Sequence, residues 1–305
     1  MHESGLTVES AATSSDGVEA LYLRRGDRAA LFALHHLPMG AEARGLVVYI
    51  HPLAEEMNKT RRMAALQSRA LARAGFAVFQ VDLSGCGDSA EEFGDATWQA
   101  WVLDVVASCR WLQARHAIQH GGAPGLPLWL WGLRSGCLLA AQAAERLDGN
   151  CHFLFWQPVL QGDLMLTQFL RLASAANMLA TANGPKTSEI KHALQAGRPA
   201  FVAGYQISAE LANGLAATKM PAAPARGRAV WLETSNAPGA ALSPGVERAV
   251  TAWRAAGGTV TARVVAGPQF WQTVEIELAP ALIDASTSAL LASLDDRSPL
   301  SSTST

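Results

Sequence analysis

The sequence predicts an α/β protein: a doubly wound, mostly parallel sheet with helices on both faces and an inserted cap. Short apolar runs rich in β-formers alternate with helical patterns, which is typical of βαβ units. Half of the 305 residues are apolar and only 16% are charged, which favours a well-buried core over disorder. The alternation is interrupted once, over residues 159–226, and this interruption predicts the cap.

Individual elements follow from the period of the apolar residues. Runs with strand character occupy residues 18–22, 29–35, 46–50, 77–81, 127–131, 153–156, 229–233 and 260–265. Helical spacing predicts helices over residues 61–74, 97–114, 137–144, 161–182 and 276–294. Gly75 directly follows the first of these helices and is typical of a C-cap.

These elements predict one core domain with an insertion. The core comprises residues 17–158 and 227–294, and the cap comprises residues 159–226, with a turn at 184–187 and a briefly β-like run at 201–205. Pro221, Pro224 and Gly227 mark the exit of the cap. Residues 1–16 and 295–305 are polar, and we expect them to be flexible.

Bulk properties exclude several classes of function. The net charge of −2 provides no basic stripe for nucleic acid. No run approaches the ~18 apolar residues of a membrane span, and the N-terminus has no apolar signal-peptide region. The four cysteines have no metal-ligand spacing. We therefore expect a cytoplasmic protein that acts on a small molecule without a cofactor or metal; its oligomeric state stays open.

The segment Gly132-Leu133-Arg134-Ser135-Gly136 has the glycine spacing of a nucleophile elbow, G-x-Nuc-x-G, between a buried strand and a helix. Its central residue is Arg134, whose guanidinium keeps its proton and cannot act as an acyl nucleophile. Ser135 is one residue further on, and a slip of one residue on a helix rotates the side chain by about 100°. We therefore expect the main-chain N–H of Ser135, and not its hydroxyl, to face the site as an oxyanion donor.

A second oxyanion donor normally comes from the loop after the strand at 46–50. In that loop Pro52 has no N–H, so we expect this donor to be moved or missing.

The remaining triad positions follow in chain order. Glu233 ends the strand at 229–233, where the acid belongs. The base belongs in the loop after the last strand, but residues 267–272 read GPQFWQ, and no histidine follows His192. The sequence therefore predicts no ordinary Ser-His-acid mechanism, and Trp271 and Gln272 of this loop become candidate ligand-binding residues.

The polar segment after the strand at 46–50 should reach the same sheet edge as Arg134. In a functional interpretation, His51 acts as a base, Glu55 or Glu56 orients Arg134, and Asn58 contributes to binding. In the alternative interpretation this segment is a solvated loop with a helix N-cap at Asn58 or Thr60.

Several motifs together closely resemble the exosortase A system-associated hydrolase 2 family of bacterial α/β-hydrolase-like proteins. They are HPLAEEMNK (51–59), RRM (61–63), Asp82 with GCGDS (85–89), FGDATW (93–98), WLWGLR (129–134), WQP (156–158), GP (267–268) and FWQ (270–272). The resemblance spans residues 51–294, and it implies an α/β-hydrolase fold and a role beside an exosortase and exopolysaccharide system. Where the wider superfamily carries serine and histidine, this chain carries Arg134 and Phe270.

Two functions remain open. In the first, the protein hydrolyses an ester, thioester or amide: Arg134 polarises the substrate, His51 or a cap residue is the base, and water attacks directly. In the second, it is a non-catalytic protein whose Arg134, at a helix N-terminus, binds an anionic ligand or a partner. Fold alone does not choose between them.

Overall fold

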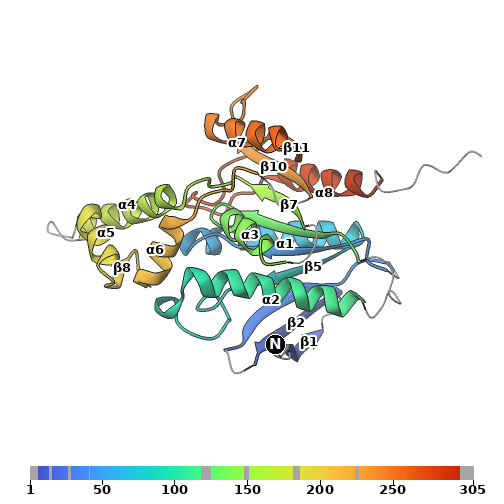
Figure 1. Cartoon of the computed structure of the whole chain (residues 1–305), viewed down its shortest axis with the longest axis horizontal. Helices are drawn as coiled ribbons and strands as arrows, with labels where there is room; N and C mark the ends of the chain where they lie inside the picture. Colours follow the sequence, from blue (N-terminus) through green and yellow to red (C-terminus); the bar gives the residue numbers. More distant parts are fainter. Residues whose placement is uncertain are drawn as a thin grey trace, which may run out of the picture.

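A computed structural model describes residues 6–13, 16–26, 29–40, 42–117, 125–147, 151–180, 186–223 and 227–295. It confirms the predicted fold class: a nine-stranded sheet has the order β1-β2-β3-β5-β4-β6-β7-β10-β11. Strands β1 to β3 pair antiparallel and the strands from β5 to β11 pair parallel. The cap lies at one end of this sheet (Figure 1).

The sheet contains β1 (Leu6–Thr13), β2 (Val18–Arg25), β3 (Leu31–His36), β4 (Gly45–Ile50), β5 (Phe76–Val81), β6 (Leu128–Leu133), β7 (Cys151–Trp156), β10 (Arg228–Ser235) and β11 (Thr259–Ala266). The core helices are α1 (Glu55–Arg73), α2 (Trp98–Ala117), α3 (Gly136–Ala144), α7 (Pro244–Ala255) and α8 (Pro280–Asp295), with a 3-10 turn η1 (Phe93–Asp95). The cap contains α4 (Gly162–Ala180), α5 (Thr187–Gln195), the hairpin β8 (Ala200–Val202) and β9 (Tyr205–Ile207), and α6 (Ala209–Ala217).

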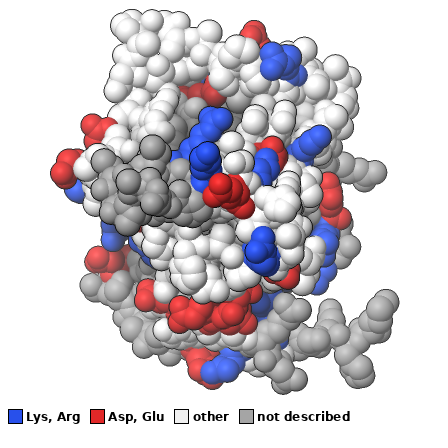
Figure 2. All heavy atoms as spheres, turned by 90° about the vertical axis from the view of Figure 1, so that its left-hand side faces the viewer, with Lys and Arg blue, Asp and Glu red and all other residues white. Residues whose placement is uncertain are grey.

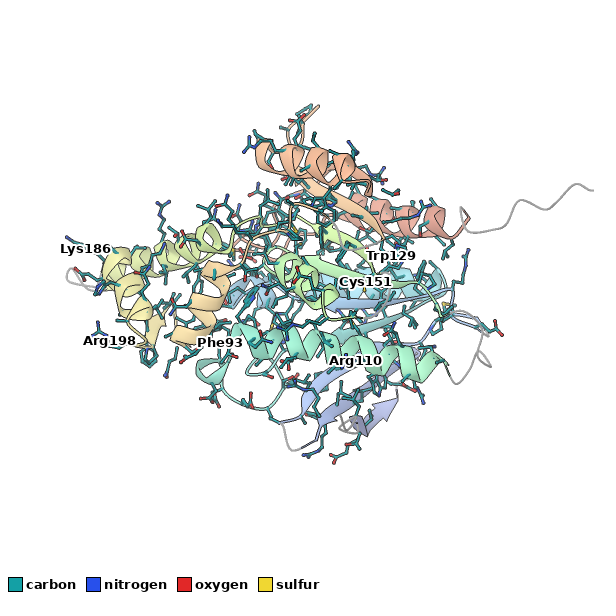
Figure 3. The ribbon with its side chains drawn as sticks, viewed as in Figure 1. Phe93, Arg110, Trp129, Cys151, Lys186 and Arg198 are labelled. Carbon is teal, nitrogen blue, oxygen red and sulfur yellow. The ribbon has the colours of Figure 1, made fainter. Side chains whose placement is uncertain are left out.

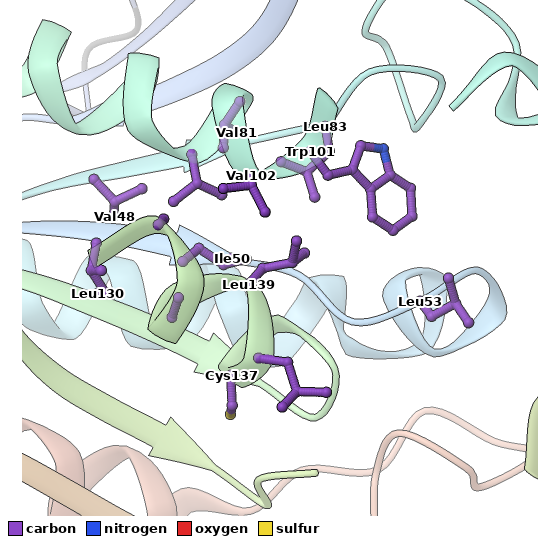
Figure 4. Close-up of a cluster of buried hydrophobic side chains, with 14 of the residues drawn as sticks. Val48, Ile50, Leu53, Val81, Leu83, Trp101, Val102, Leu130, Cys137 and Leu139 are labelled. Atoms are coloured by element: carbon purple, nitrogen blue, oxygen red, sulfur yellow. The ribbon is translucent and has the colours of Figure 1, made fainter. Parts of the chain in front are cut away.

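Two apolar layers hold the sheet, because parallel strands covered by helices on both faces bury every side chain. Strands β4, β6 and β7 are buried along their whole length. Helices α2, α3 and α7 contribute to the cluster on one face, which includes Ile50, Trp101 and Leu139 (Figure 4). Helices α1 and α8 contribute to the cluster on the other face. No described helix is both long enough and apolar enough to cross a membrane.

The cap is docked on the core through α6 and its hairpin. The Ser208 hydroxyl caps α6 and donates to the Ala96 carbonyl. A Cβ on Gly214 would lie 2.4 Å from the Cβ of Trp98, so α6 approaches α2 closely only because this residue is glycine. Tyr205 packs edge-on against Phe93, which lies where cap and core meet (Figure 3).

The structure corrects several predicted boundaries. Leu6–Thr13, predicted to be flexible, forms the edge strand β1, because its main chain pairs in register with β2. Helix α1 begins at Glu55, so the predicted polar loop is largely its first turns. Helix α8 begins only at Pro280, which suits a first helical position because proline has a fixed φ and no N–H. Helices α5, α6 and α7 lack a sequence prediction altogether.

Other predictions fall outside the described residues. They concern the ends at residues 1–5 and 296–305, Gly184 and Pro185 in the predicted turn, and Pro224 at the cap exit.

Candidate functional site

The elbow is formed as the glycine spacing predicts. Arg134 lies between β6 and α3 with φ 55, a left-handed conformation that non-glycine residues rarely adopt, and its N–H donates to the Trp156 carbonyl. A Cβ on Gly136 would lie 2.2 Å from the Ile50 oxygen, so α3 begins in direct contact with the end of β4. This packing places Arg134 at the carboxyl edge in the middle of the sheet.

Residues from three distant segments bind the Arg134 guanidinium. Its Nε lies 3.3 and 3.4 Å from the two carboxylate oxygens of Glu56, and its Nη2 lies 3.2 Å from Glu56 Oε1. Nη2 also donates to Gln168 Oε1 of the cap at 3.2 Å. The guanidinium carbon lies 5.5 Å from the ring centroid of Trp271, a cation–π distance. Nη1 makes no hydrogen bond with any residue that the structure describes.

This ion pair is largely removed from water. The Arg134 and Glu56 side chains are 15% and 16% exposed. Burial raises the pKa of Glu56 above its usual value, while the charge and hydrogen bonds of Arg134, and then the charge of Lys59, act in the opposite direction. Glu56 is therefore a carboxylate that depends on its partner arginine to remain ionised.

Two cavities meet at Arg134. One, of about 600 Å³, lies between α1, the cap and the loop after β11, and the other, of about 660 Å³, extends toward α7. Arg134, Gln157, Met165 and Gln168 line both cavities. Each side chain at this junction can therefore contact a molecule in either cavity.

The charges around the two cavities are mixed, with basic groups in excess. Lys59, Arg134 and Arg171 face Glu55 and Glu56 in the first cavity. Lys219 and Arg248 join Glu233 in the second. Viewed from the cap end, basic and acidic side chains lie beside one another near the centre of this face (Figure 2).

Backbone strain is concentrated at the first cavity. Among the described residues, the non-glycine positions with positive φ are Ala54, Glu91, Arg134, Gln157 and Ala203. Three of them line this cavity, and Ala54 lies between its lining residues Leu53 and Glu55. Strained conformations persist only where the surroundings impose them, and they cluster at binding and catalytic sites.

Of the two candidate glutamates, the structure brings Glu56 to Arg134, whereas Glu55 binds the cap. Tyr205 donates its hydroxyl to Glu55 at 3.0 Å, and the Asn58 amide donates to the Tyr205 oxygen at 3.0 Å. Burial and the bond to Glu55 raise the pKa of Tyr205 to about 12. Glu55 and Asn58 thus fasten the hairpin β8–β9 over the cavity.

The structure gives His51 a structural position and not that of the predicted base. Its Nδ1 is bonded to the Pro52 carbonyl at 2.8 Å, and its Nε2 accepts the Leu83 N–H at 3.2 Å. The ring is 3% exposed, burial lowers its pKa, and it lines neither cavity at Arg134. Both nitrogens are therefore occupied by main chain.

Ser135 and Glu233 do not form a nucleophile–acid arrangement with Arg134. Ser135 is 2% exposed and lines neither cavity, in agreement with the expected rotation of its hydroxyl away from the site. Glu233 accepts the main-chain N–H and the hydroxyl of Ser243 at 2.6 and 2.8 Å and the Gln157 amide at 3.5 Å. Its carboxylate orients the segment before α7.

In the loop after β11, Trp271 and not Phe270 is the residue that faces the elbow. Phe270 is fully buried and packs edge-on against Trp156, with ring centroids 6.1 Å apart. Trp271 presents its ring to Arg134. Gln272 bonds to the Gln269 side chain, and both glutamines line the first cavity.

Three residues of the site lack a sequence prediction: Gln157, Gln168 and Lys59. Gln157 directly follows the buried strand β7, so the rule that polar residues at strand ends meet at one edge could have found it. Gln168 comes from the cap, whose position over the sheet has no sequence signal. Lys59 lies on α1, which begins earlier than the predicted helix.

The sheet order, the elbow and the cap define a protein of the α/β-hydrolase fold. A family model described as serine aminopeptidase, S33, matches residues 41–213, more than half of the chain. The chain therefore belongs to this family. No curated protein compared with the sequence gives a match.

Solved structures with the same fold include several esterases and lipases. The ferulic acid complex of Est1E from Butyrivibrio proteoclasticus is 13% identical, with a TM-score of 0.60 over 88% of this chain and 97% of that chain. A thermostable carboxyl esterase from Bacillus coagulans is 14% identical, with a TM-score of 0.59 over 92% and 98% of the two chains. Monoglyceride lipase from Saccharomyces cerevisiae is 16% identical, with a TM-score of 0.56 over 90% and 94%. At these identities the similarity shows the fold alone.

A double-mutant cycle tests the central ion pair. We expect Arg134→Met to lower the free energy of unfolding by about 3 kcal/mol, because it leaves the Glu56 carboxylate buried without a partner. Adding Glu56→Gln should restore part of this loss, with a coupling energy of about 1–3 kcal/mol in urea unfolding. The control Arg171→Met removes an exposed arginine of the same cavity and should change stability by less than about 0.5 kcal/mol. Strict additivity of the two variants would contradict the pairing.

Proposed function

We propose that this protein binds a small anionic or carbonyl-bearing molecule non-covalently at Arg134 and does not hydrolyse it through a Ser-His-acid triad. The observation that carries this proposal is the arginine itself. Arg134 stands where the elbow presents a nucleophile, and Glu56 and Trp271 fix it while Nη1 keeps its two N–H groups for a ligand.

The chemistry of the surrounding main chain supports this proposal. A guanidinium offers planar, paired donors that match a carboxylate or a similar oxyanion. In this fold, oxyanion donors come from the N–H after the elbow residue, here Ser135, and from the loop after β4, where Leu53 is the first residue beyond Pro52 with an N–H. Neither N–H donates to another residue in the described part of the chain. A ligand oxygen near Arg134 would therefore find further donors.

The same geometry disfavours ordinary serine hydrolysis. Trp271 faces the elbow residue, and an indole cannot accept the proton of a nucleophile. Glu233 is held by Ser243 and Gln157, and the Ser135 hydroxyl is buried outside both cavities.

A serine-directed probe tests this part of the proposal. We expect no covalent labelling by a fluorophosphonate and no turnover of short chromogenic esters, because no serine hydroxyl is paired with a base at the elbow. Intact-protein mass spectrometry measures the labelling. Stoichiometric labelling that disappears in Ser135→Ala would contradict the proposal.

A second candidate function, hydrolysis by direct attack of water, is favoured by the raised pKa of Glu56. Here the Glu56 carboxylate would accept a proton from water while the water oxygen bonds to the substrate carbonyl carbon. Arg134 would stabilise the oxyanion. The bond to the leaving group would then break, and Glu56 would return the proton to that group.

The two candidates predict opposite pH dependences. As pH falls through the raised pKa of Glu56, protonation removes the counter-charge of Arg134, so affinity for an anion should rise. Hydrolysis that needs the Glu56 carboxylate should slow over the same range. Benzenesulfonate suits the binding measurement, because it stays ionised throughout, and calorimetry would measure its affinity.

Glu56→Gln mimics the protonated state and should raise benzenesulfonate affinity about fivefold, the equivalent of one lost competing hydrogen bond. The control Glu55→Gln removes the same charge from the cap contact and should change affinity less. Weaker binding in Glu56→Gln, together with loss of an ester-cleaving activity, would favour the hydrolase.

We also propose that the protein works in the cytoplasm beside an exosortase and exopolysaccharide system. The motif set of residues 51–294 supports this proposal, and the Arg134 site does not bear on it. In a bacterium that carries the gene, its deletion should reduce secreted exopolysaccharide, measured as total carbohydrate, and the intact gene should restore it. Unchanged secretion would contradict the assignment.

A further inference from the structure

A third cavity lies away from Arg134, beneath α1. It has a volume of about 190 Å³ and lies between α1 and the strands β3, β4 and β5. It shares no lining residue with the two cavities at the elbow. Its walls are mainly apolar and include Phe32, Leu34, Met57, Ala64 and Val81.

The Tyr49 side chain lines this cavity and brings a buried hydroxyl with it. Tyr49 is 5% exposed, and its hydroxyl has no hydrogen-bond partner among the described residues. The neighbouring Thr60 hydroxyl donates to the main-chain oxygens of Glu56 and Met57 and so has no proton left for Tyr49. A buried hydroxyl without a partner is costly, and native proteins seldom retain one.

The other polar groups of the cavity are already paired. Arg61 and Asp82 form an ion pair at 3.2 Å, so the cavity carries no net charge from them. Gln80 Oε1 is bonded to His36 at 2.8 Å. His51, as described above, uses both of its ring nitrogens. The phenol of Tyr49 is therefore the group that a bound molecule would satisfy.

Size and polarity together define the ligand. An apolar cavity of about 150 Å³ is large enough to admit benzene. This cavity is somewhat larger, neutral and apolar except at one hydroxyl. We propose that it binds a small neutral aromatic alcohol, the size of phenol, whose hydroxyl pairs with the Tyr49 hydroxyl.

Phenol and benzene are matched probes for this site, because they differ only in the hydroxyl. With the full chain, we expect phenol to bind more tightly than benzene in ligand-observed NMR titrations. Tyr49→Phe should weaken phenol about tenfold, the effect of one buried hydrogen bond, and leave benzene unchanged. Ala64→Leu fills the cavity and should abolish binding of both probes. Ala65→Leu, at a half-buried lining position, replaces it if Ala64→Leu lowers stability.

The stability of Tyr49→Phe without ligand provides an independent readout. If the hydroxyl waits unpaired for a ligand, its removal should leave the melting temperature unchanged or raise it. A lowered melting temperature would show that an ordered water or a protein group already satisfies the hydroxyl, and would overturn the proposal. So would equal phenol affinity in the wild type and Tyr49→Phe, or phenol binding that persists in both cavity-filling variants.

Discussion

The ion pair between Arg134 and Glu56 is the interaction on which the site depends. A guanidinium that is 15% exposed at the end of a buried strand requires a counter-charge, because an unpaired buried ion is costly. Glu56 supplies this charge only because α1 begins at Glu55 and turns that carboxylate toward the elbow. Gln168 from the cap and Trp271 from the loop after β11 complete the surroundings. Three segments that are distant in sequence are thereby oriented around one side chain.

The rigid core maintains the strained backbone around this pair. Gly136 brings α3 against the end of β4, so the elbow cannot relax without separating two buried elements. The positive φ of Ala54 and of Gln157 occurs where the loops after β4 and β7 leave fully buried strands. Such conformations cost of order 1–3 kcal/mol each and persist when surrounding structure imposes them. The packing of the sheet thus stabilises a cavity that the local sequence alone would not form.

The sequence predicts the fold and the elbow because both depend on local patterns: apolar periodicity and glycine spacing. It leaves Glu55 and Glu56 as alternatives, because the predicted helix begins at residue 61, and each residue of a helix turns the side chain by about 100°. The role of His51 is hidden in the sequence, since its partners are main-chain groups of Pro52 and Leu83 that the fold brings together. Cap residues such as Gln168 reach the site through the docking of α6 on α2, for which the alternation of elements has no signal.

The chemistry of the pair explains why an arginine here suits binding better than acyl transfer. A nucleophile must release a proton and form a covalent bond, whereas a guanidinium keeps its proton at any working pH. In the free protein, the Glu56 carboxylate occupies the face of Arg134 that an anionic ligand would otherwise share. A ligand therefore gains affinity only through contacts that Glu56 does not make, with Nη1, with the N–H groups of Leu53 and Ser135, or with the cavity walls. Under the proposed function, selectivity resides in these additional contacts, and the ion pair excludes anions that carry charge but lack a matching shape.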